Sequence, residues 1–341
     1  MPASPDNDAP PLPIDTRGGM LSNSVLQIFY SRTRTAMKIT RRQLIQAGAG
    51  LATGAGLCNP LLAQPPLNMV TIPSSGQQVP GVGIGCRNYR GSLNSADMPV
   101  FRDTFATYHR LGGKVVDTSP NYGNSEEIIG RLMDELGIRE DLWVATKVDR
   151  EDRASGIARM ERSFELLGGD SFELMQVHNL RGVEIQLETM AAWKEQGLFR
   201  YIGVTTSSDR QYEALADVMN HHTLDFIQLD YSLGNRNAND RLLPMALDKG
   251  VAVLVNLPFG RGRLFNAVGD RSLPDWAADI DATSWAQVFL KYVMSHPSGA
   301  IPIPGTTKPH HAEDNLSAAR GRLPDANLRR EMENFIDPLL G

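Results

Sequence analysis

Apolar residues follow two alternating patterns from about residue 69 onward. Short runs of Val, Ile and Leu bounded by Gly, Pro, Asn and Asp are typical of buried parallel strands, whereas apolar residues at intervals of three and four predict helices. We expect strands at 81–85, 114–117, 142–147, 172–178, 201–205, 226–229, 251–257 and 300–304. We expect helices at 99–111, 125–136, 153–167, 183–196, 209–219, 240–249, 283–295, 310–319 and 326–339.

This alternation predicts an α/β fold, a (β/α)8 TIM barrel in which each strand is followed by a helix. Segments 69–72 and 78–80, separated by Ser74-Ser75-Gly76, predict an N-terminal β-hairpin, and the last helices are C-terminal additions. The alternative is a doubly wound open sheet, which would need a Gly-rich phosphate turn after its first strand. Residues 81–85 read Gly-Val-Gly-Ile-Gly, without the third glycine at the required spacing, so the barrel is favoured.

Composition excludes several classes of protein. The chain has 341 residues, of which 41% are hydrophobic and 21% are charged, so it can bury a sizeable core. Its net charge is −5 and it has no basic stripe, which argues against nucleic-acid binding. No run is long and apolar enough to anchor the mature form in a membrane.

The first part of the chain resembles an export signal rather than part of a fold. In residues 37–63, the pair Arg41 and Arg42 is followed by a weakly apolar Gly/Ala-rich run and by Ala63, a candidate cleavage site, as in a twin-arginine signal peptide. We therefore expect the twin-arginine export machinery as a partner and a periplasmic location, or a cytoplasmic one if the leader is not functional. Residues 1–36 show no periodic pattern and are interpreted as disordered or as an over-called start, which leaves 64–341 as the barrel domain.

Cysteine usage fits this division. Cys58 lies in the leader and Cys86 in the barrel domain, so the mature chain could form no internal disulfide.

Polar residues follow three consecutive predicted strands. Asp117 ends one strand and Tyr122 follows five residues later, Lys147 ends the next strand, and His178 ends the one after that. Alone, each has a structural explanation, such as a strand cap or a solvated side chain. Because the carboxyl ends of barrel strands face one mouth, we instead expect the four side chains to meet there. Asn124 or Ser125 is placed to cap the helix that follows.

The four side chains suit the reduction of a carbonyl group. Tyr122 can donate a proton to the forming alkoxide, and an ammonium beside it, Lys147, would lower its pKa from about 10. Asp117 would hold Lys147, and a neutral His178 could hydrogen-bond the carbonyl oxygen. No side chain donates hydride, so this hypothesis requires a nicotinamide cofactor.

In this order, and within Asp-Thr-Ser-Pro-Asn-Tyr-Gly-Asn-Ser-Glu at 117–126, the four residues resemble the catalytic tetrad of the aldo-keto reductase superfamily. The resemblance extends over about residues 68–320. It implies NADPH, with NADH possible, as the cofactor, and a small aldehyde or ketone as the substrate. Some relatives hold the cofactor with little turnover, so a redox sensor or partner module on the same barrel is the alternative function.

The resemblance also implies cofactor contacts at strand ends and in the loops beyond them. These are Gly85, Cys86, Thr205, Thr206, Gln228, Asn256, Leu257, Gly260, Gly262, Gly305, Thr306, Thr307, Lys308, His311, Asp314 and Asn315. Thr206 replaces an Asn that grips the carboxamide, Asn256 stands where many members stack a Tyr, and His311 replaces the Arg of the 2′-phosphate site. Segment 258–262 is interpreted as a cover over the pyrophosphate, with an ordinary mobile loop as the alternative. These departures keep the non-catalytic alternative open.

No metal site is predicted, because no acidic or Cys partner accompanies the histidines. In this superfamily, loops set the substrate specificity. The residues on these loops that we expect to line the substrate pocket are Arg87, Tyr89, Asn179 and Phe259, and the sequence does not rank them by importance.

Overall fold

The computed structural model describes residues 64–341. The predicted signal peptide at 37–63 and the segment 1–36 lie outside the described residues. Within 64–341, no helix has both the length and the apolar character needed to cross a bilayer.

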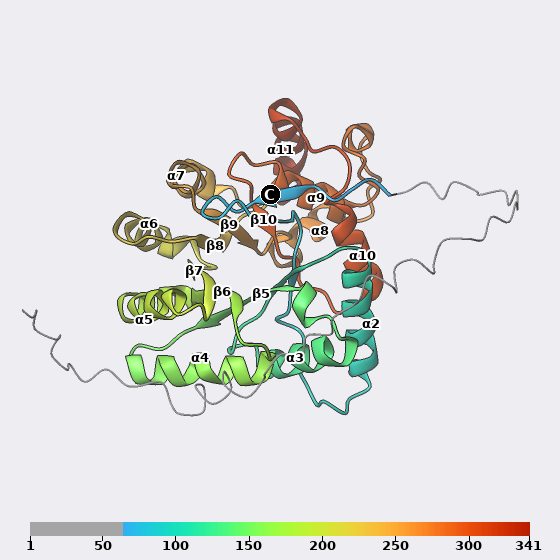
Figure 1. Cartoon of the computed structure of the whole chain (residues 1–341). Helices are drawn as coiled ribbons and strands as arrows, with labels where there is room; N and C mark the ends of the chain where they lie inside the picture. Colours follow the sequence, from blue (N-terminus) through green and yellow to red (C-terminus); the bar gives the residue numbers. More distant parts are fainter. Residues whose placement is uncertain (1–63) are drawn as a thin grey trace, which may run out of the picture. The chain divides into compact units, whose positions relative to one another are not determined.

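Eight parallel strands form one sheet in chain order, and helices surround it (Figure 1). The strands are β3 (Ile84–Gly85), β4 (Val115–Asp117), β5 (Trp143–Val148), β6 (Phe172–Val177), β7 (Phe199–Thr205), β8 (Phe226–Asp230), β9 (Ala252–Asn256) and β10 (Ile301–Pro302). The sheet closes on itself, because Gly85 bridges Gly305 and its N–H donates to the carbonyl oxygen of Pro304. This closure confirms the predicted (β/α)8 barrel.

The closure requires glycine on the first strand. A Cβ at Gly85 would lie 2.8 Å from the carbonyl oxygen of Ile303, closer than van der Waals contact allows. A Cβ at Gly83 would lie 2.9 Å from side-chain carbons of Val115 and Ile303. Gly83 and Gly85 therefore allow the first strand to pack closely against its neighbours, the last strand and β4.

A helix follows each barrel strand, as expected. These helices are α2 (Asp97–Arg110), α3 (Ser125–Leu136), α4 (Arg153–Leu167), α5 (Val183–Glu195), α6 (Tyr212–His221), α7 (Leu242–Lys249), α9 (Trp285–Met294) and α10 (Pro309–Ser317), and α11 (Ala326–Leu340) ends the chain. Between β9 and α9 the chain adds α8 (Arg263–Val268) and a 3-10 helix (Asp275–Ile280), which the sequence pattern did not predict. Each has six residues, too few for a helical period to be recognised.

The predicted hairpin is present and closes the amino-terminal end of the barrel. β1 (Met69–Thr71) pairs antiparallel with β2 (Gln78–Pro80). Ile72 and Val79 belong to the same buried cluster as Trp143 and Phe226, which begin β5 and β8. The hydroxyl of Tyr201 on β7 also donates to Gln77 Oε1 at 2.7 Å. The hairpin thus covers the strand starts, and the carboxyl ends remain for a site.

Candidate active site

A cavity of about 670 Å³ lies at the carboxyl ends of the strands. Asp117, Tyr122, Lys147 and His178 all line it, so the structure brings together the four residues that the sequence placed at one mouth. The remaining lining residues are Gly85, Cys86, Arg87, Asn88, Asn121, Asn179, Thr205, Ser207, Gln228, Asn256, Leu257, Pro258, Phe259, Arg261, Gly262, Phe265, Ile303 and Gly305.

Lys147 and Asp117 form a buried ion pair at the end of β4 and β5. Lys147 Nζ lies 2.7 Å from both carboxylate oxygens and donates to the carbonyl oxygen of Thr118 at 2.6 Å. Burial disfavours the ammonium, but Asp117, through its charge and hydrogen bonds, and Tyr122 and Cys86 together outweigh burial and leave the pKa of Lys147 raised. The site therefore contains a fixed, charged ammonium group.

Two amides hold the other side of the Asp117 carboxylate. Gln176 Nε2 lies 3.4 Å from Oδ1, and Gln228 Nε2 lies 3.5 Å from Oδ2. All of these partners are buried, so the carboxylate has hydrogen-bond donors in place of water.

Tyr122 lies beside this ion pair, with its ring centroid 5.4 Å from Lys147 Nζ. Burial raises the pKa of Tyr122, Lys147 lowers it, Asp117 raises it and Arg87 lowers it, and the net pKa is above its ordinary value. Lys147 acts in the expected direction, but the expectation of a lowered pKa is wrong because burial is the larger effect. The phenol consequently stays protonated at neutral pH and is ready to donate.

His178 faces Tyr122, with ring centroids 6.0 Å apart and ring planes at 87°. Its Nδ1 lies 3.0 Å from Ser119 Oγ and 3.4 Å from Asn121 Nδ2. Ser119 Oγ accepts from the Asn121 N–H, so its own hydrogen is available for Nδ1. With donors on Nδ1, the ring hydrogen belongs on Nε2. Burial and the charge of Lys147 lower the pKa of His178 to about 3, so the ring is neutral, as expected.

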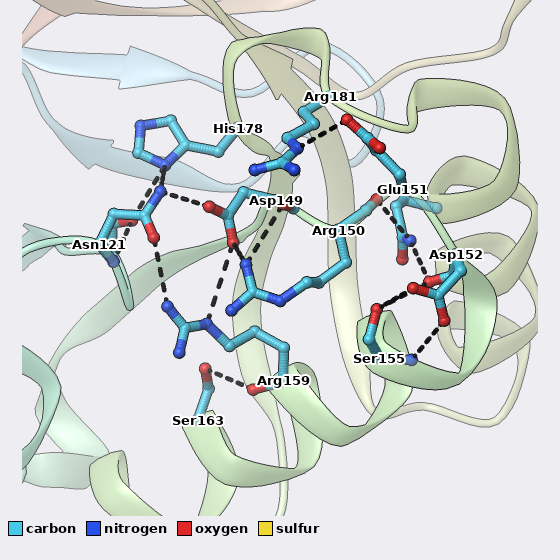
Figure 2. A network of polar contacts seen from close by, with 12 residues as sticks. Asn121, Asp149, Arg150, Glu151, Asp152, Ser155, Arg159, Ser163, His178 and Arg181 are labelled. Atoms are coloured by element: carbon cyan, nitrogen blue, oxygen red, sulfur yellow. Dashed lines mark hydrogen bonds and ion pairs between the residues drawn. The ribbon is translucent and has the colours of Figure 1, made fainter.

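A network around Asp149 sets the orientation of Asn121, as Figure 2 shows. Asn121 Nδ2 donates to Asp149 Oδ2 at 2.5 Å, and Asn121 Oδ1 accepts from Arg159 at 3.2 Å. Arg150 donates to the other oxygen of Asp149 at 2.6 Å. Because a carboxylate faces the amide nitrogen and a guanidinium faces the amide oxygen, Asn121 presents N–H to His178. Asn121 and Asp149 were not predicted as site residues, because their only local signal is their position just beyond strands β4 and β5.

The predicted cofactor residues separate into two groups. The first group lines the cavity that contains Tyr122, and consists of Gly85, Cys86, Thr205, Gln228, Asn256, Leu257, Gly262 and Gly305. Thr206, Gly260, Thr306, Thr307, Lys308, His311, Asp314 and Asn315 are not part of its lining. The second group therefore stays a prediction for a part of the cofactor that extends beyond this cavity.

Two buried acceptors on the cavity wall lack a partner within residues 64–341. They are Gln228 Oε1 on β8 and Asn256 Oδ1 on β9. The Asn256 amide nitrogen already donates to the Thr206 carbonyl oxygen at 3.0 Å. A buried acceptor left without a donor costs about 1–3 kcal/mol, so these oxygens are suited to N–H groups of a ligand. A carboxamide N–H group, such as that of a nicotinamide, fits this requirement.

The side chain of Thr206 does not reach the cavity. Its hydroxyl donates to Gln211 Oε1 at 2.6 Å and accepts from the Ser208 N–H at 3.1 Å. Local hydrogen bonds before α6 thus occupy the hydroxyl, and a contact of Thr206 with the cofactor stays a prediction. The unpaired Asn256 oxygen offers an acceptor within the cavity.

In the segment beyond β10, two of the predicted contacts already have partners in the protein. Thr306 Oγ1 accepts from the Lys308 N–H at 3.1 Å. The Asp314 oxygens accept from Ser284 Oγ at 2.8 Å and from Gln287 Nε2 at 2.7 Å. These bonds tie the segment to the start of α9, so Asp314 has a structural role besides any contact with adenine.

The candidate substrate residues also separate. Arg87, Asn179 and Phe259 line the cavity. Tyr89 does not: it is fully buried and packs against Phe101 and Phe105 at centroid distances of 5.0 and 5.2 Å. Its prediction as a lining residue is wrong, because its ring is buried in an apolar cluster and does not face the cavity.

Asn124 stands at the N-cap of α3, as expected, but its side chain makes no capping hydrogen bond. Its side chain pairs with the backbone of Gly91 at 3.0 and 2.8 Å.

No group of three His, Cys, Asp or Glu side chains within residues 64–341 is arranged to hold a metal ion.

Comparison with known proteins identifies relatives of this chain. A family model described as "Aldo/keto reductase family" matches residues 82–332. Aldo-keto reductase str7 of Strobilurus tenacellus is 27% identical over 259 residues, which cover 64% of this chain and 76% of that protein. Aldo-keto reductase YhdN of Bacillus subtilis is 28% identical over 214 residues, 58% of this chain and 64% of that protein.

Solved structures share the fold. An aldo/keto reductase from Klebsiella pneumoniae, in complex with NADP and acetate, has a TM-score of 0.67 at 21% identity, covering 80% of this chain and 96% of that chain. The thermostable aldo-keto reductase Tm1743 has a TM-score of 0.64 at 24% identity, covering 80% and 99%.

Proposed function

Because this chain belongs to the aldo/keto reductase family, we propose that it reduces small aldehydes or ketones to alcohols with NADPH, and that Tyr122 donates the proton. The observation that carries the proposal is the meeting of a fixed ammonium, a protonated phenol and a neutral imidazole in one cavity. This combination supplies a proton donor, a charge that stabilises its phenolate and a second hydrogen-bond donor, as carbonyl reduction requires.

The proposed chemistry gives each side chain one task. The nicotinamide, when bound, supplies the hydride. The substrate's carbonyl oxygen accepts hydrogen bonds from the Tyr122 hydroxyl and from His178 Nε2, which fixes its direction. As negative charge grows on that oxygen, Tyr122 transfers its proton, and the Lys147 ammonium stabilises the phenolate left behind. Asp117 keeps Lys147 charged and in place.

Two observations support NADPH as the cofactor: the hydrogen-bond acceptors of the cavity suit its carboxamide, and solved relatives bind NADP or NADPH. The unpaired Gln228 and Asn256 oxygens suit the carboxamide. The solved relatives from Klebsiella pneumoniae are complexes with NADP and with NADPH. Lys308 and His311 are the candidates for the 2′-phosphate, and NADH is the competing cofactor.

The test is oxidation of NADPH or NADH by the purified protein in the presence of aldehydes, ketones and reactive dicarbonyls. We expect turnover with NADPH and a lower kcat/KM with NADH. Lack of turnover with every carbonyl would overturn the proposal. Tight, stoichiometric cofactor binding without turnover would instead support the redox-sensor alternative.

We further propose that residues 37–63 direct export to the periplasm through the twin-arginine machinery. Support comes from the paired arginines, the weakly apolar run and Ala63. Replacing Arg41 and Arg42 together by Lys should leave an uncleaved precursor in the cytoplasm. A wild-type protein that stays in the cytoplasm of a host with this machinery would contradict the proposal.

A further inference from the structure

We propose that the substrates of this reductase carry an anionic group, and that Arg87 binds that group beside the reacting carbonyl. The proposal deepens the proposed carbonyl reduction and rests on it. It concerns a residue that no catalytic or cofactor role explains.

The backbone next to Arg87 is held firmly against the catalytic segment. The N–H of Cys86 donates to the Asp117 carbonyl oxygen at 2.8 Å, and the Cys86 carbonyl oxygen accepts from Ser125 Oγ at 2.8 Å. On the other side of Arg87, the N–H and the carbonyl oxygen of Gly91 both form hydrogen bonds with the side chain of Asn124. Arg87 therefore extends from a loop attached at both sides to the segment that carries Tyr122.

Arg87 shares its cavity with the two groups that are proposed to contact the carbonyl oxygen, Tyr122 and His178. Burial is the main influence on both pKa values: it raises the pKa of Tyr122 and lowers that of His178, while the charge of Arg87 lowers both. An anion bound by Arg87 would consequently lie near the carbonyl that Tyr122 and His178 hold.

Arg87 has no partner for its charge within the described part of the chain. It forms no ion pair and no side-chain hydrogen bond there, and its side chain is exposed. Of the other two cations that line the cavity, Lys147 pairs with Asp117, whereas Arg261, on the loop after β9, likewise forms no ion pair within the described residues. The donors of Arg87 are thus available to a ligand.

The chemistry of guanidinium indicates the class of ligand. Its planar fork of N–H donors matches the two oxygens of a carboxylate, or two oxygens of a phosphate. Asn88, Asn179 and Ser207, which line the same cavity, add neutral polar groups but no negative charge that would repel an anion. A carbonyl compound with a carboxylate or phosphate near its carbonyl group therefore fits this cavity.

The experiment compares matched pairs of substrates in the full-length protein. The first pair is 4-carboxybenzaldehyde and 4-nitrobenzaldehyde, which differ in charge more than in size, and the second is glyceraldehyde 3-phosphate and glyceraldehyde. The variants are Arg87→Met, which removes the charge, and Arg87→Lys, which keeps it without the fork. Arg90→Met is the control, because Arg90 is exposed on the same loop and does not line the cavity.

Arg87→Met should lower kcat/KM for the preferred anionic substrate about tenfold or more, mainly through KM, because charged hydrogen bonds are lost. The neutral partner should change less than about threefold, Arg87→Lys should fall between, and Arg90→Met should match the wild type. The pair with the larger loss tells whether the anion is a carboxylate or a phosphate.

Equal losses for charged and neutral substrates, or no loss for either, would overturn the proposal. A weaker Kd for NADPH in Arg87→Met would also overturn it, by assigning Arg87 to a cofactor phosphate. If the wild type reduces the neutral aldehydes but shows no preference for anions, the proposed function stands and this inference fails. If it reduces neither, both fail.

Discussion

The ammonium of Lys147 lies 2.7 Å from both carboxylate oxygens of Asp117, and only 1% and 3% of the two side chains is exposed. Two charges buried this deeply depend on each other, because water reaches neither. Removing either charge alone would therefore destabilise the barrel, because it leaves the other charge buried and unpaired.

Asp117→Asn should destabilise the protein by about 3–5 kcal/mol, because it leaves a buried ammonium without its counter-charge. Urea unfolding at neutral pH measures the loss. The matched variant Asp117→Asn with Lys147→Met removes both charges and should recover most of the stability while activity stays low. A single variant as stable as the wild type would show that Lys147 reaches water.

Tyr122→Phe should lower kcat by about 10²–10⁴-fold, the usual contribution of a general acid. The ring packing and the Kd for NADPH should remain close to those of the wild type. Steady-state kinetics and cofactor fluorescence titration measure the two quantities. Full activity in this variant would remove Tyr122 from the mechanism.

Reduction should show little pH dependence through the neutral range. Tyr122 must be protonated to donate, and because its pKa is raised, activity is lost only as pH rises through that raised value. His178 must be neutral, and with a pKa of about 3 it becomes charged only in strong acid. The pH profile of the hydride step, measured in single turnovers, tests both the loss of activity at high pH and the loss in strong acid. A limb near 6.5, the ordinary pKa of His, would contradict the burial of His178.

Asn121→Ala combined with Ser119→Ala should disturb the tautomer of His178, because Nδ1 loses both of its donors. We expect kcat to fall about tenfold, since one neutral hydrogen bond is worth about 1 kcal/mol and the ring also loses its orientation. Nitrogen NMR of the imidazole should show hydrogen on Nε2 in the wild type and a mixture in the variant. Arg162→Ala, on the exposed face of α4, serves as the control.

An unchanged tautomer in the double variant would mean that another part of the cavity orients His178. A loss of kcat with an unchanged tautomer would assign Ser119 and Asn121 to substrate contact instead.

The order of strands and helices, and the meeting of the four residues proposed to be catalytic, followed from the sequence. The periodicity of a strand or a helix is a local property of the sequence. A residue at the carboxyl end of a barrel strand lies at the same end of the barrel, independent of the conformation of the loops. The proximity of Asp117, Lys147 and His178 could therefore be predicted from the sequence alone. The short α8 and the 3-10 helix after it could not, because each has too few residues to show a period.

The environment of each side chain was decided only by the tertiary structure. Asn121 is oriented by Asp149, 28 residues away, and Tyr89 turns into an apolar cluster although its neighbour Arg87 lines the cavity. The net pKa of Tyr122 depends on how much water the surrounding loops exclude, which outweighs the nearby charge of Lys147. Burial and charge are sums over residues distant in the chain, so local pattern determined where the chemical groups are, and closure of the barrel determined how they behave.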